Sequence, residues 1–401
     1  MYNLVTVPLY DTLGKDAIEH IMNQTETKAV VCSADRIKNL LNSKSSLPNL
    51  KTIISMDAVD KEWVTKGAEV GVEVVSMESA ESEGAKQPQE LCLPTPDDMV
   101  TICYTSGTTG LPKGAMLTHR NVLSPSQSYQ VASAKGVGIT IGRDDIHISY
   151  LPLAHVFERV FMAFVVSAGA RIGFYQGDST KLLDDIAELR PTFFLSVPRL
   201  FNRIYDKVWA GVKAKGGIAE KLFNMAYQSK KAGLATGSVT HPIWDKIVFA
   251  KVRQRLGGRV RFIISGSAPL SPEVMEFLRI AFCCDVLEGY GQTETAAGAF
   301  ITLPSDTSLG NVGVPFPCCE AKLVDVPEMN YTSADKPFPR GEICFRGYNC
   351  FTGYYKMPDK TAETIDADGW VHSGDIGMWD DRGRLMIIDR KKKYVLCASH
   401  C

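Results

Sequence analysis

The chain has 401 residues, of which 45% are hydrophobic and 22% are charged, and its formal net charge is -1. This length predicts two or three packed units, because a domain usually holds roughly 100–200 residues. The balanced charge provides no excess of Lys and Arg to bind a phosphate backbone, so we expect no nucleic-acid partner. The longest apolar stretch, residues 161–170, is too short to span a bilayer, which needs roughly 20 residues.

Targeting signals and cysteines place further limits on the class of protein. The N-terminus has no basic region and no small-residue cleavage site, which predicts an intracellular protein. The eleven cysteines include no Cys-x-x-Cys pair. The sequence therefore favours reduced, mostly buried thiols over a disulfide framework or a zinc site.

The first hundred residues alternate short apolar runs with helical patterns. We expect strands at residues 4–7, 29–32, 52–55 and 99–104, helices at 16–22 and 37–41, and a polar, Pro-rich surface loop at 76–98. This alternation is typical of a parallel sheet with crossover helices. Because nothing precedes the run at 4–7 to cover it, we expect sequence to be missing upstream.

The middle of the chain continues with helical patterns at residues 181–190, 199–209 and 243–256, followed by a buried strand at 260–265. Gly257-Gly258 is the expected C-terminal cap of the third helix. Ser271-Pro272-Glu273 has the cap residue, proline and acidic group of a helix start. Beyond about residue 310, short strands at 321–326, 341–346 and 385–388 predict an antiparallel, barrel-like unit.

A loop of hydroxyls and glycines follows the strand at 99–104. From Tyr104 to Gly114 it reads Tyr-Thr-Ser-Gly-Thr-Thr-Gly-Leu-Pro-Lys-Gly. Glycines let backbone N–H groups approach phosphate oxygens, hydroxyls donate further hydrogen bonds and Lys113 adds positive charge, which predicts a polyphosphate site. The spacing does not fit the Gly-x4-Gly-Lys-Ser/Thr loop of kinases and GTPases. The phosphate-binding residues expected here are Thr105, Ser106, Gly107, Thr108, Thr109, Gly110 and Lys113.

Three shorter motifs follow in order: Gly266-Ser-Ala-Pro269, Glu288-Gly-Tyr-Gly-Gln-Thr-Glu294 and His372-Ser-Gly-Asp375. Together with the loop they resemble, in register over nearly the whole chain, the AMP-forming acyl-adenylate superfamily, which includes acyl-CoA synthetases and luciferases. The resemblance implies an α/β fold. This is the large domain of an ANL-type adenylating enzyme, with stacked βαβ sheets, crossover helices and a smaller antiparallel barrel-like subdomain.

The resemblance also implies a role for each matched residue. Tyr290 would stack on adenine, Thr293 would bond the α-phosphate, and Glu294 and Thr109 would hold Mg²⁺. Asp375 would accept both ribose hydroxyls, with Ser373 where Thr is more usual, and Arg390 would contact the ribose at an interdomain hinge. The expected catalytic residues are Lys113, Thr293 and Glu294. The expected nucleotide-binding set adds Gly266, Ser267, Ala268, Gly289, Tyr290, Gly291, Asp375 and Arg390.

Residues 150–159, 181–185, 190–199, 368–377 and 383–392 resemble the eukaryotic long-chain fatty acyl-CoA synthetases. Such a substrate requires an apolar tunnel, because each buried methylene contributes about 0.8 kcal/mol. In the family the region of His155 borders the acyl site, so His155, Val156 and Phe157 are the expected substrate contacts. A hydrogen-bonded core histidine is the alternative for His155. A basic targeting patch is the alternative to the hinge for residues 390–393.

The reaction implied by the resemblance uses ATP, Mg²⁺ and CoA. A fatty carboxylate attacks the α-phosphorus of Mg·ATP to give acyl-AMP and pyrophosphate, and the CoA thiol then displaces AMP. The loop at 104–114 is expected to fold around the phosphates while Tyr290, Glu294 and Asp375 converge on the same nucleotide. Members of the family sit on endoplasmic reticulum, peroxisomal or mitochondrial outer membranes, so peripheral membrane association is expected through segments outside this chain.

The resemblance breaks at both ends of the chain. We expect a segment ahead of Leu4 and a small C-terminal domain after the hinge to be missing, and residues 393–401 no longer follow the family. The expected divisions are a remnant of the first βαβ subdomain with its polar loop at 1–98, an AMP-binding α/β subdomain at 99–309, a barrel-like subdomain at 310–388, and a hinge and tail at 389–401.

The expected loss of the C-terminal domain affects the predicted activity. That domain carries a lysine that neutralises charge as the carboxylate attacks, so we expect ATP binding with slow turnover. Two alternatives stay open: a non-catalytic fragment that binds ATP or AMP, and an adenylating enzyme for another carboxylic acid.

Overall fold

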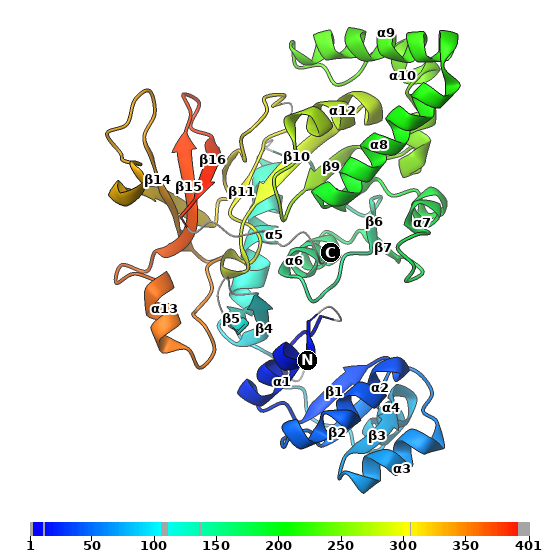
Figure 1. The fold of residues 1–401 in the computed structure, drawn as a ribbon, viewed down its shortest axis with the longest axis vertical. Helices are drawn as coiled ribbons and strands as arrows, with labels where there is room; N and C mark the ends of the chain where they lie inside the picture. Colours follow the sequence, from blue (N-terminus) through cyan, green and yellow to red (C-terminus); the bar gives the residue numbers. More distant parts are fainter. Residues whose placement is uncertain (1–2, 11–12, 106–110, 136–137, 305, 392–401) are drawn as a thin grey trace. The chain divides into compact units, whose positions relative to one another are not determined.

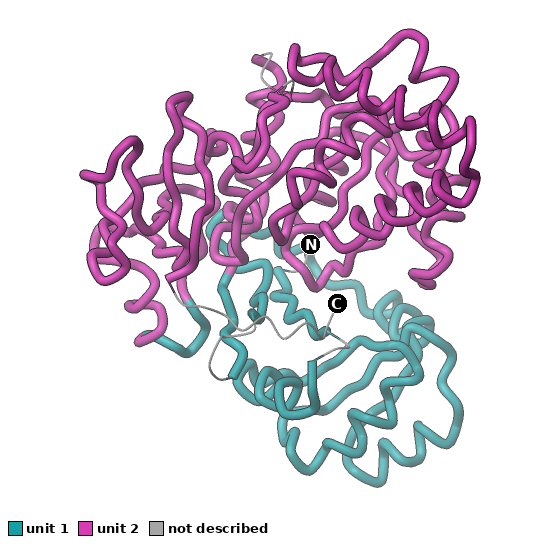
Figure 2. Tube along the Cα trace, turned by 45° about the horizontal axis from the view of Figure 1, so that its top comes forward, with its two compact units in different colours: residues 1–116, 354–358, 397–401 teal, residues 117–353, 359–396 magenta. Residues whose placement is uncertain are grey.

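The computed structural model describes residues 3–10, 13–105, 111–135, 138–304 and 306–391. The chain forms two compact units (Figure 1, Figure 2). Among the described residues, the smaller unit holds the part of the chain up to Met116 together with Tyr354–Pro358, and the larger unit holds Leu117–Gly353 and residues 359–391. Each unit has a hydrophobic core of its own.

The smaller unit contains a parallel three-stranded sheet in the order β1-β2-β3. Buried apolar side chains of this sheet and its helices, such as Ile37, Ile53 and Val74, form the core. A second, two-stranded sheet pairs β4 with β5. The elements are α1 (Lys15–Gln24), β1 (Ala29–Cys32), α2 (Ala34–Asn42), η1 (Lys44–Ser46), β2 (Thr52–Ser55), α3 (Lys61–Glu69), β3 (Glu73–Ser76), α4 (Met77–Lys86), β4 (Met99–Thr105) and β5 (Lys113–Thr118).

Two expectations for this unit were wrong. Residues 4–7 form no regular strand; Thr6 makes an isolated parallel bridge with Thr101. Residues 76–98 contain a helix, α4, where a loop was expected. The Ser76 hydroxyl accepts a hydrogen bond from the Ser79 N–H at 3.1 Å and caps the helix start. The helix carries no buried residue, so its sequence lacks the apolar stripe that would have revealed it.

The main sheet of the larger unit has the order β12-β11-β10-β9-β8. β8, β9 and β10 are parallel, whereas β11 and β12 run antiparallel to their neighbours. A separate parallel pair joins β6 to β7. The strands are β6 (Ile146–Ser149), β7 (Arg171–Phe174), β8 (Phe193–Ser196), β9 (Phe262–Ser265), β10 (Asp285–Tyr290), β11 (Phe300–Ile301) and β12 (Val314–Pro315).

Helices cover both faces of this sheet, because its central strands are apolar on both sides. Successive residues alternate between two cores: Phe194 and Ile263 belong to one, and Phe193 and Phe262 to the other. α8, α9 and α12 supply the first core, and α5 and α6 supply the second. The helices are α5 (His119–Ala134), α6 (Val156–Ser167), α7 (Leu182–Leu189), α8 (Pro198–Lys215), α9 (Gly217–Leu234), α10 (Trp244–Ile247), α11 (Ala250–Arg253), η2 (Gln254–Leu256), α12 (Pro272–Phe282), η3 (Thr293–Thr295), η4 (Pro327–Met329) and α13 (Pro358–Thr364).

The single helix expected at residues 243–256 is broken into α10, α11 and η2. The N–H groups of Val248 and Phe249 both donate to the Trp244 carbonyl, so the helical hydrogen-bond ladder is interrupted there. Phe249 is fully buried in the core at this break. The expected cap is confirmed in part, since Gly257 follows η2 in the left-handed conformation at φ 76°.

The last part of the chain forms a four-stranded antiparallel sheet in the order β13-β14-β15-β16, drawn from gold to red in Figure 1. The strands are β13 (Cys319–Val324), β14 (Arg340–Gly347), β15 (Val371–Trp379) and β16 (Leu385–Arg390). The register shifts between Glu342 and Cys344: these residues pair with Ile376 and His372, four positions apart on β15. Two extra residues of β15 therefore bulge out around Gly374.

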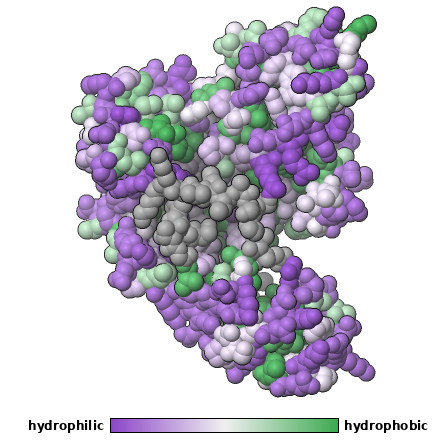
Figure 3. All heavy atoms as spheres, viewed as in Figure 1, coloured by the Kyte–Doolittle hydropathy of each residue, from purple (hydrophilic) through white to green (hydrophobic). Residues whose placement is uncertain are grey.

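The surface of the molecule mixes residue types. In the view of Figure 3, hydrophobic residues lie between hydrophilic ones on both units. Within the residues that the structure describes, no helix combines the length and the apolar character needed to cross a lipid bilayer. None of the nine cysteines that the structure describes is in a disulfide.

Candidate nucleotide and acyl site

The two ends of the hydroxyl- and glycine-rich loop are held together in the smaller unit. Thr105 ends β4 and Lys113 begins β5. The Thr105 hydroxyl donates to the Lys113 carbonyl at 3.5 Å, and the Lys113 ammonium lies 3.3 Å from the Tyr354 hydroxyl and 4.3 Å from the centre of its ring. Five of the predicted phosphate ligands lie outside the described residues, namely Ser106, Gly107, Thr108, Thr109 and Gly110.

A polar cluster lies in the larger unit where the end of β10 comes close to the middle of β15. The Tyr290 hydroxyl donates to Asp375 Oδ2 at 2.8 Å, and the Gln292 amide donates to the same oxygen at 3.0 Å. The Arg390 Nε lies 2.8 Å from Asp375 Oδ1. The cluster joins residues from β10, β15 and β16, so three of the residues predicted to bind nucleotide are brought together.

The carboxylate of Asp375 is buried at 3% exposure and is held by the bulge in β15. Its backbone N–H donates to the Ser373 hydroxyl at 3.0 Å, and the Gln292 amide donates to the Ser373 carbonyl at 2.8 Å. Gly374 between them has φ +73°, a conformation that side chains rarely adopt. The Ser-Gly-Asp motif therefore forms a tight turn that points Asp375 toward Tyr290.

The hydroxyl of Tyr290 binds a carboxylate, whereas its ring packs among other aromatic side chains. Its ring centre lies 5.9 Å from that of Phe345 and 6.3 Å from that of Phe300. Burial, and then the neighbouring Asp375 carboxylate, raises the pKa of the Tyr290 hydroxyl well above its ordinary value. The hydroxyl is therefore a hydrogen-bond donor at any physiological pH.

Thr293 and Glu294 lie on η3, which directly follows β10. The turn is closed by a reciprocal cap between Gln292 and Thr295, and the Glu294 carbonyl accepts from the Phe351 N–H at 2.8 Å. Gly291 is required here, since a Cβ on it would lie 2.4 Å from the Ala297 carbonyl oxygen. Thr293 and Glu294 are both half-buried, and the hard oxygen of a carboxylate suits Mg²⁺.

Gly266, Ser267 and Ala268 follow β9, at the carboxyl end of the parallel strands where α/β proteins commonly bind ligands. Ser267 has φ +71° and Ser267 and Ala268 are exposed, so this turn is open to solvent. A Cβ on Gly266 would lie 2.8 Å from the Phe157 ring. Glycine therefore lets the Phe157 ring pack directly on the backbone of the turn.

An apolar pocket lies beside this turn, between α5, α6 and the ends of β9 and β10. Its volume is about 70 Å³, and Ile264, Gly289 and Ala297 line it on the sheet side. The aromatic residues of its wall are Tyr129, Phe157, Phe161, Phe164, Phe300 and Phe316. Ligand pockets commonly hold about 300–1,000 Å³, so a ligand of ordinary size fits here only after these side chains rotate.

The three predicted substrate contacts have different places in the structure. Phe157 lines the apolar pocket, whereas Val156 is buried in the core of the larger unit. His155 Nδ1 accepts a hydrogen bond from the Phe157 N–H at 3.2 Å and caps α6. Burial lowers the pKa of His155, so the ring is neutral at pH 7 and its Nδ1 can act as this acceptor.

A larger hollow, of about 790 Å³, lies elsewhere in the larger unit. Its charged groups already bind one another: Arg384 pairs with Asp306 and Asp380, and the Arg279 guanidinium donates to four backbone carbonyls. Because the carboxylates and the buried guanidinium have protein partners, we assign the candidate site to the apolar pocket and the Asp375 cluster.

Sequence reasoning missed some residues of this arrangement. Gln292 was passed over, although it lies inside the Glu288–Glu294 motif and binds both Ser373 and Asp375. Nothing in the sequence indicates that residues on α5, such as Tyr129, line the pocket, because an aromatic residue in a helix does not show which cavity it faces.

Known proteins resemble this chain along most of its length. The family model of AMP-binding enzymes matches residues 1–355. The peroxisomal long chain acyl-CoA synthetase 6 of Arabidopsis thaliana is 51% identical over 99% of this chain and 56% of its own length. Long-chain-fatty-acid–CoA ligase 1 of Homo sapiens is 47% identical over 98% of this chain and 56% of its own length. The chain thus spans little more than half of these relatives.

Solved structures give the same fold. The A-PCP didomain of a carboxylic acid reductase from Segniliparus rugosus, solved in complex with AMP, matches 97% of this chain and 52% of its own with a TM-score of 0.75 at 27% identity. The adenylation domain of a carboxylate reductase from Mycobacterium chelonae matches 96% with a TM-score of 0.74 at 26% identity. The predicted α/β fold of an adenylating enzyme's large domain is confirmed, and the chain belongs to the AMP-binding enzyme family.

Proposed function

We propose that this protein activates long-chain fatty acids, joining the fatty carboxylate to AMP and then to CoA at the expense of ATP. One observation carries the proposal: β10 lies at both parts of the site. Gly289 lines the apolar pocket, and the next residue, Tyr290, binds Asp375. An apolar acyl chain and a polar nucleotide can therefore meet at one strand end, where the carboxylate and the α-phosphate have to react.

On the nucleotide side, each group has a chemical role. The Tyr290 ring stacks on adenine, with Gly266, Ser267 and Ala268 beside it. Asp375 accepts the ribose hydroxyls: Arg390 occupies one lone pair of Oδ1, and a carboxylate oxygen has a second. Arg390 holds this carboxylate in place at 2.8 Å.

On the phosphate side, Lys113 and the loop at 105–110 hold the pyrophosphate that leaves, and Thr293 bonds the α-phosphate. The oxygen donors of Glu294 and Thr109 fit Mg²⁺, which supplies charge neutralisation for the phosphates when it is bound. Lys113 adds a positive charge that does not depend on the metal. The thiol of CoA then displaces AMP from the acyl-adenylate.

The acyl chain enters the pocket between α5 and α6. Its wall is almost wholly apolar, so each further methylene of the substrate adds about 0.8 kcal/mol until the chain reaches the end. This dependence on length distinguishes a fatty-acid site from a site for a small or aromatic acid.

Association with an intracellular membrane, such as that of a peroxisome, forms part of the proposal. Its support is kinship, because the name of the Arabidopsis relative places that protein in peroxisomes.

The test is ATP–pyrophosphate exchange by the purified 401-residue chain, together with calorimetry of AMP binding. We expect palmitate to stimulate exchange, whereas acetate and benzoate do not. The Val160→Phe substitution fills the apolar pocket, so it should lower stimulation by palmitate and leave AMP affinity unchanged. Lys113→Met should lower exchange with every acid.

Two outcomes would replace the proposal. Exchange that responds to short or aromatic acids but not to palmitate would indicate an adenylating enzyme for another carboxylic acid, the reaction class suggested by the reductase domains of the same fold. Tight AMP binding without exchange for any acid would indicate a non-catalytic nucleotide-binding protein.

A further inference from the structure

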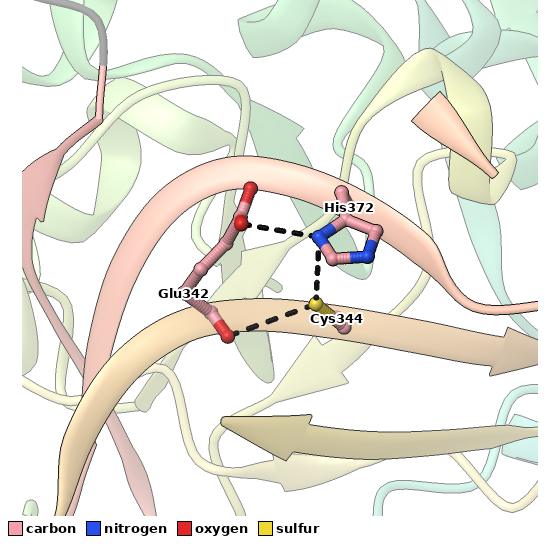
Figure 4. Close-up of side chains that lie close together, drawn as sticks. All are labelled: Glu342, Cys344 and His372. Atoms are coloured by element: carbon pink, nitrogen blue, oxygen red, sulfur yellow. Dashed lines mark hydrogen bonds and ion pairs between the residues drawn. The ribbon is translucent and has the colours of Figure 1, made fainter. Parts of the chain in front are cut away.

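Three side chains with different metal-ligand atoms meet on the face of β14 and β15. Cys344 Sγ lies 3.4 Å from His372 Nδ1, which lies 3.1 Å from Glu342 Oε2 (Figure 4). One ligand atom from each residue lies within 4.8 Å of the other two. We propose that Glu342, Cys344 and His372 form a binding site for a borderline-soft divalent cation, with Zn²⁺ the best match. The proposal does not depend on the proposed ligase activity.

The spacing of the ligand atoms suits zinc. Zn–N bonds of about 2.0–2.1 Å and Zn–S bonds of about 2.3 Å place neighbouring ligand atoms of a tetrahedral site roughly 3.3–3.6 Å apart. The Cys344–His372 and His372–Glu342 distances of 3.4 and 3.1 Å are already close to this range. The third pair of ligand atoms, from Glu342 and Cys344, lies within 4.8 Å, so side-chain movement brings these two atoms into the range, and the fourth position is left for water.

The fold builds this cluster from strand geometry. Residues two apart on a strand point to the same face, so Glu342 and Cys344 lie on one side of β14. His372 is the direct partner of Cys344 on β15, and side chains of paired residues lie next to each other. The ligands are therefore fixed by backbone pairing and need no flexible loop to bring them together.

Outer partners orient two of the three ligands. The second ring nitrogen of His372, Nε2, lies 3.5 Å from Asp366 Oδ2, and a carboxylate on the far nitrogen is a usual partner of a metal-binding histidine. The Gly374 N–H donates to Glu342 Oε1 at 3.1 Å and leaves Oε2 to face His372. These contacts hold the imidazole and the carboxylate in the orientation that a bound cation requires.

The mixture of donors selects the class of metal. A sulfur and an imidazole nitrogen favour Zn²⁺ and related transition metals, whereas Mg²⁺ and Ca²⁺ prefer sites made of oxygen alone. Glu342 and Cys344 are buried and the His372 side chain is 27% exposed, so a cation can enter past the imidazole. The cluster differs in chemistry from the all-oxygen Mg²⁺ site proposed at Glu294.

Two costs oppose metal binding. The Lys391 ammonium lies 3.3 Å from Glu342 Oε2 and must withdraw; it can do so because its side chain is 40% exposed and lies 3.7 Å from Glu328 Oε1. Burial, with the nearby Glu342 carboxylate, raises the pKa of the Cys344 thiol to about 12. Binding therefore replaces the S–H bond with a metal–sulfur bond and releases the proton to solvent.

The experiment uses the full chain with Co²⁺ as a spectroscopic probe and Zn²⁺ as a competitor. Because the sequence also contains Cys397, His400 and Cys401, the background carries Cys397→Ser and Cys401→Ser. We expect one equivalent of Co²⁺ to give a thiolate-to-cobalt charge-transfer band and the visible spectrum of a tetrahedral site. Addition of Zn²⁺ should remove both signals.

Four variants locate the site. Cys344→Ser should abolish the charge-transfer band, whereas Cys319→Ser, at another buried cysteine, should keep it. Asp366→Asn should weaken Zn²⁺ binding about 10–100-fold, the usual effect of removing an outer partner. Lys391→Met should strengthen binding, because it removes the cation that competes for Glu342.

Three results would overturn the proposal. One is a band that survives Cys344→Ser, and another is Zn²⁺ uptake that is equal in the parent chain and in the Cys344→Ser and His372→Gln variants, which would indicate adventitious binding. The third is an affinity that Lys391→Met leaves unchanged. Circular dichroism of each variant establishes that it is folded, and Lys391→Met gives a gain of binding that misfolding cannot imitate.

Discussion

Two buried carboxylates of the larger unit, Glu288 on β10 and Asp375 on β15, have different surroundings. Asp375 is 3% exposed and accepts from Tyr290 and Gln292 while it pairs with Arg390. Glu288 is 7% exposed and accepts from the Leu270 N–H at 3.1 Å, and burial raises its pKa to about 7 against the opposing effects of that bond and of Arg279. Two carboxylates of similar burial therefore differ in the partners that they bind, and the partners of Glu288 only partly offset the effect of burial on its pKa.

The largest expected effect comes from removing the paired carboxylate. Asp375→Ala should lower AMP affinity by about 100-fold or more, because it removes the ribose acceptor and leaves buried donors without a partner. Isothermal titration calorimetry with AMP measures this. Glu288→Gln is the matched control, and it should change AMP affinity by less than about threefold. Equal losses in both variants would contradict the distinction between the two carboxylates.

Glu288 should instead make the stability of the folded protein depend on pH. Glu288 has an ordinary pKa of 4.5 and a folded pKa of about 7, so the folded protein holds this proton more tightly than the unfolded chain. Its contribution to stability is complete below pH 4.5 and is lost as the pH rises to about 7. Glu288→Gln should therefore raise the free energy of unfolding at pH 8 by about 1–3 kcal/mol.

Urea denaturation at pH 5 and pH 8 measures this difference. The substitution keeps an oxygen that can accept from the Leu270 N–H, so the two proteins should differ less at pH 5 than at pH 8. A difference that is the same at both pH values would mean that Glu288 is already ionised in the folded protein.

The smallest effect should come from removing the cationic partner of Asp375, so that this carboxylate, like Glu288, accepts hydrogen bonds without an adjacent salt bridge. Arg390→Met removes the cation beside Asp375 while Tyr290 and Gln292 remain. Because the Arg390 side chain is 54% exposed and solvent screens it, stability should fall by less than about 1 kcal/mol. AMP affinity should fall about tenfold, since the charged partner that holds the ribose acceptor in place is lost. Arg390→Lys should keep more affinity than Arg390→Met, and equal values would show that charge is unimportant.

Elements that depend on neighbouring residues could be predicted from the sequence, whereas elements that depend on distant contacts could not. α12 was predicted from its first turn, and the Ser271 hydroxyl does cap it by accepting from the Val274 N–H. The strands at 29–32 and 52–55 were predicted because apolar β-branched runs recur there. The helix at 77–86 was missed because it is exposed, and the break at Phe249 was missed because it serves a distant core contact.

The same distinction applies to the candidate site. Tyr290, Asp375 and Arg390 were predicted from motifs, and the structure places them together through one carboxylate. The importance of Gln292 came only from its contact with Ser373 across more than eighty residues. The absence of paired cysteines argues against a zinc site in the sequence, and only strand pairing shows that a single cysteine lies beside a histidine and a glutamate.

By itself, the sequence determined the motifs, the main strands and helices, and the family, because each depends on residue types at short and fixed spacing. Only the tertiary structure decided which faces meet: the bulge that turns Asp375 toward Tyr290, the pocket between α5 and α6, and the register that sets His372 beside Cys344. The physical reason is that such contacts follow from strand pairing and core packing between distant segments, which no local pattern encodes.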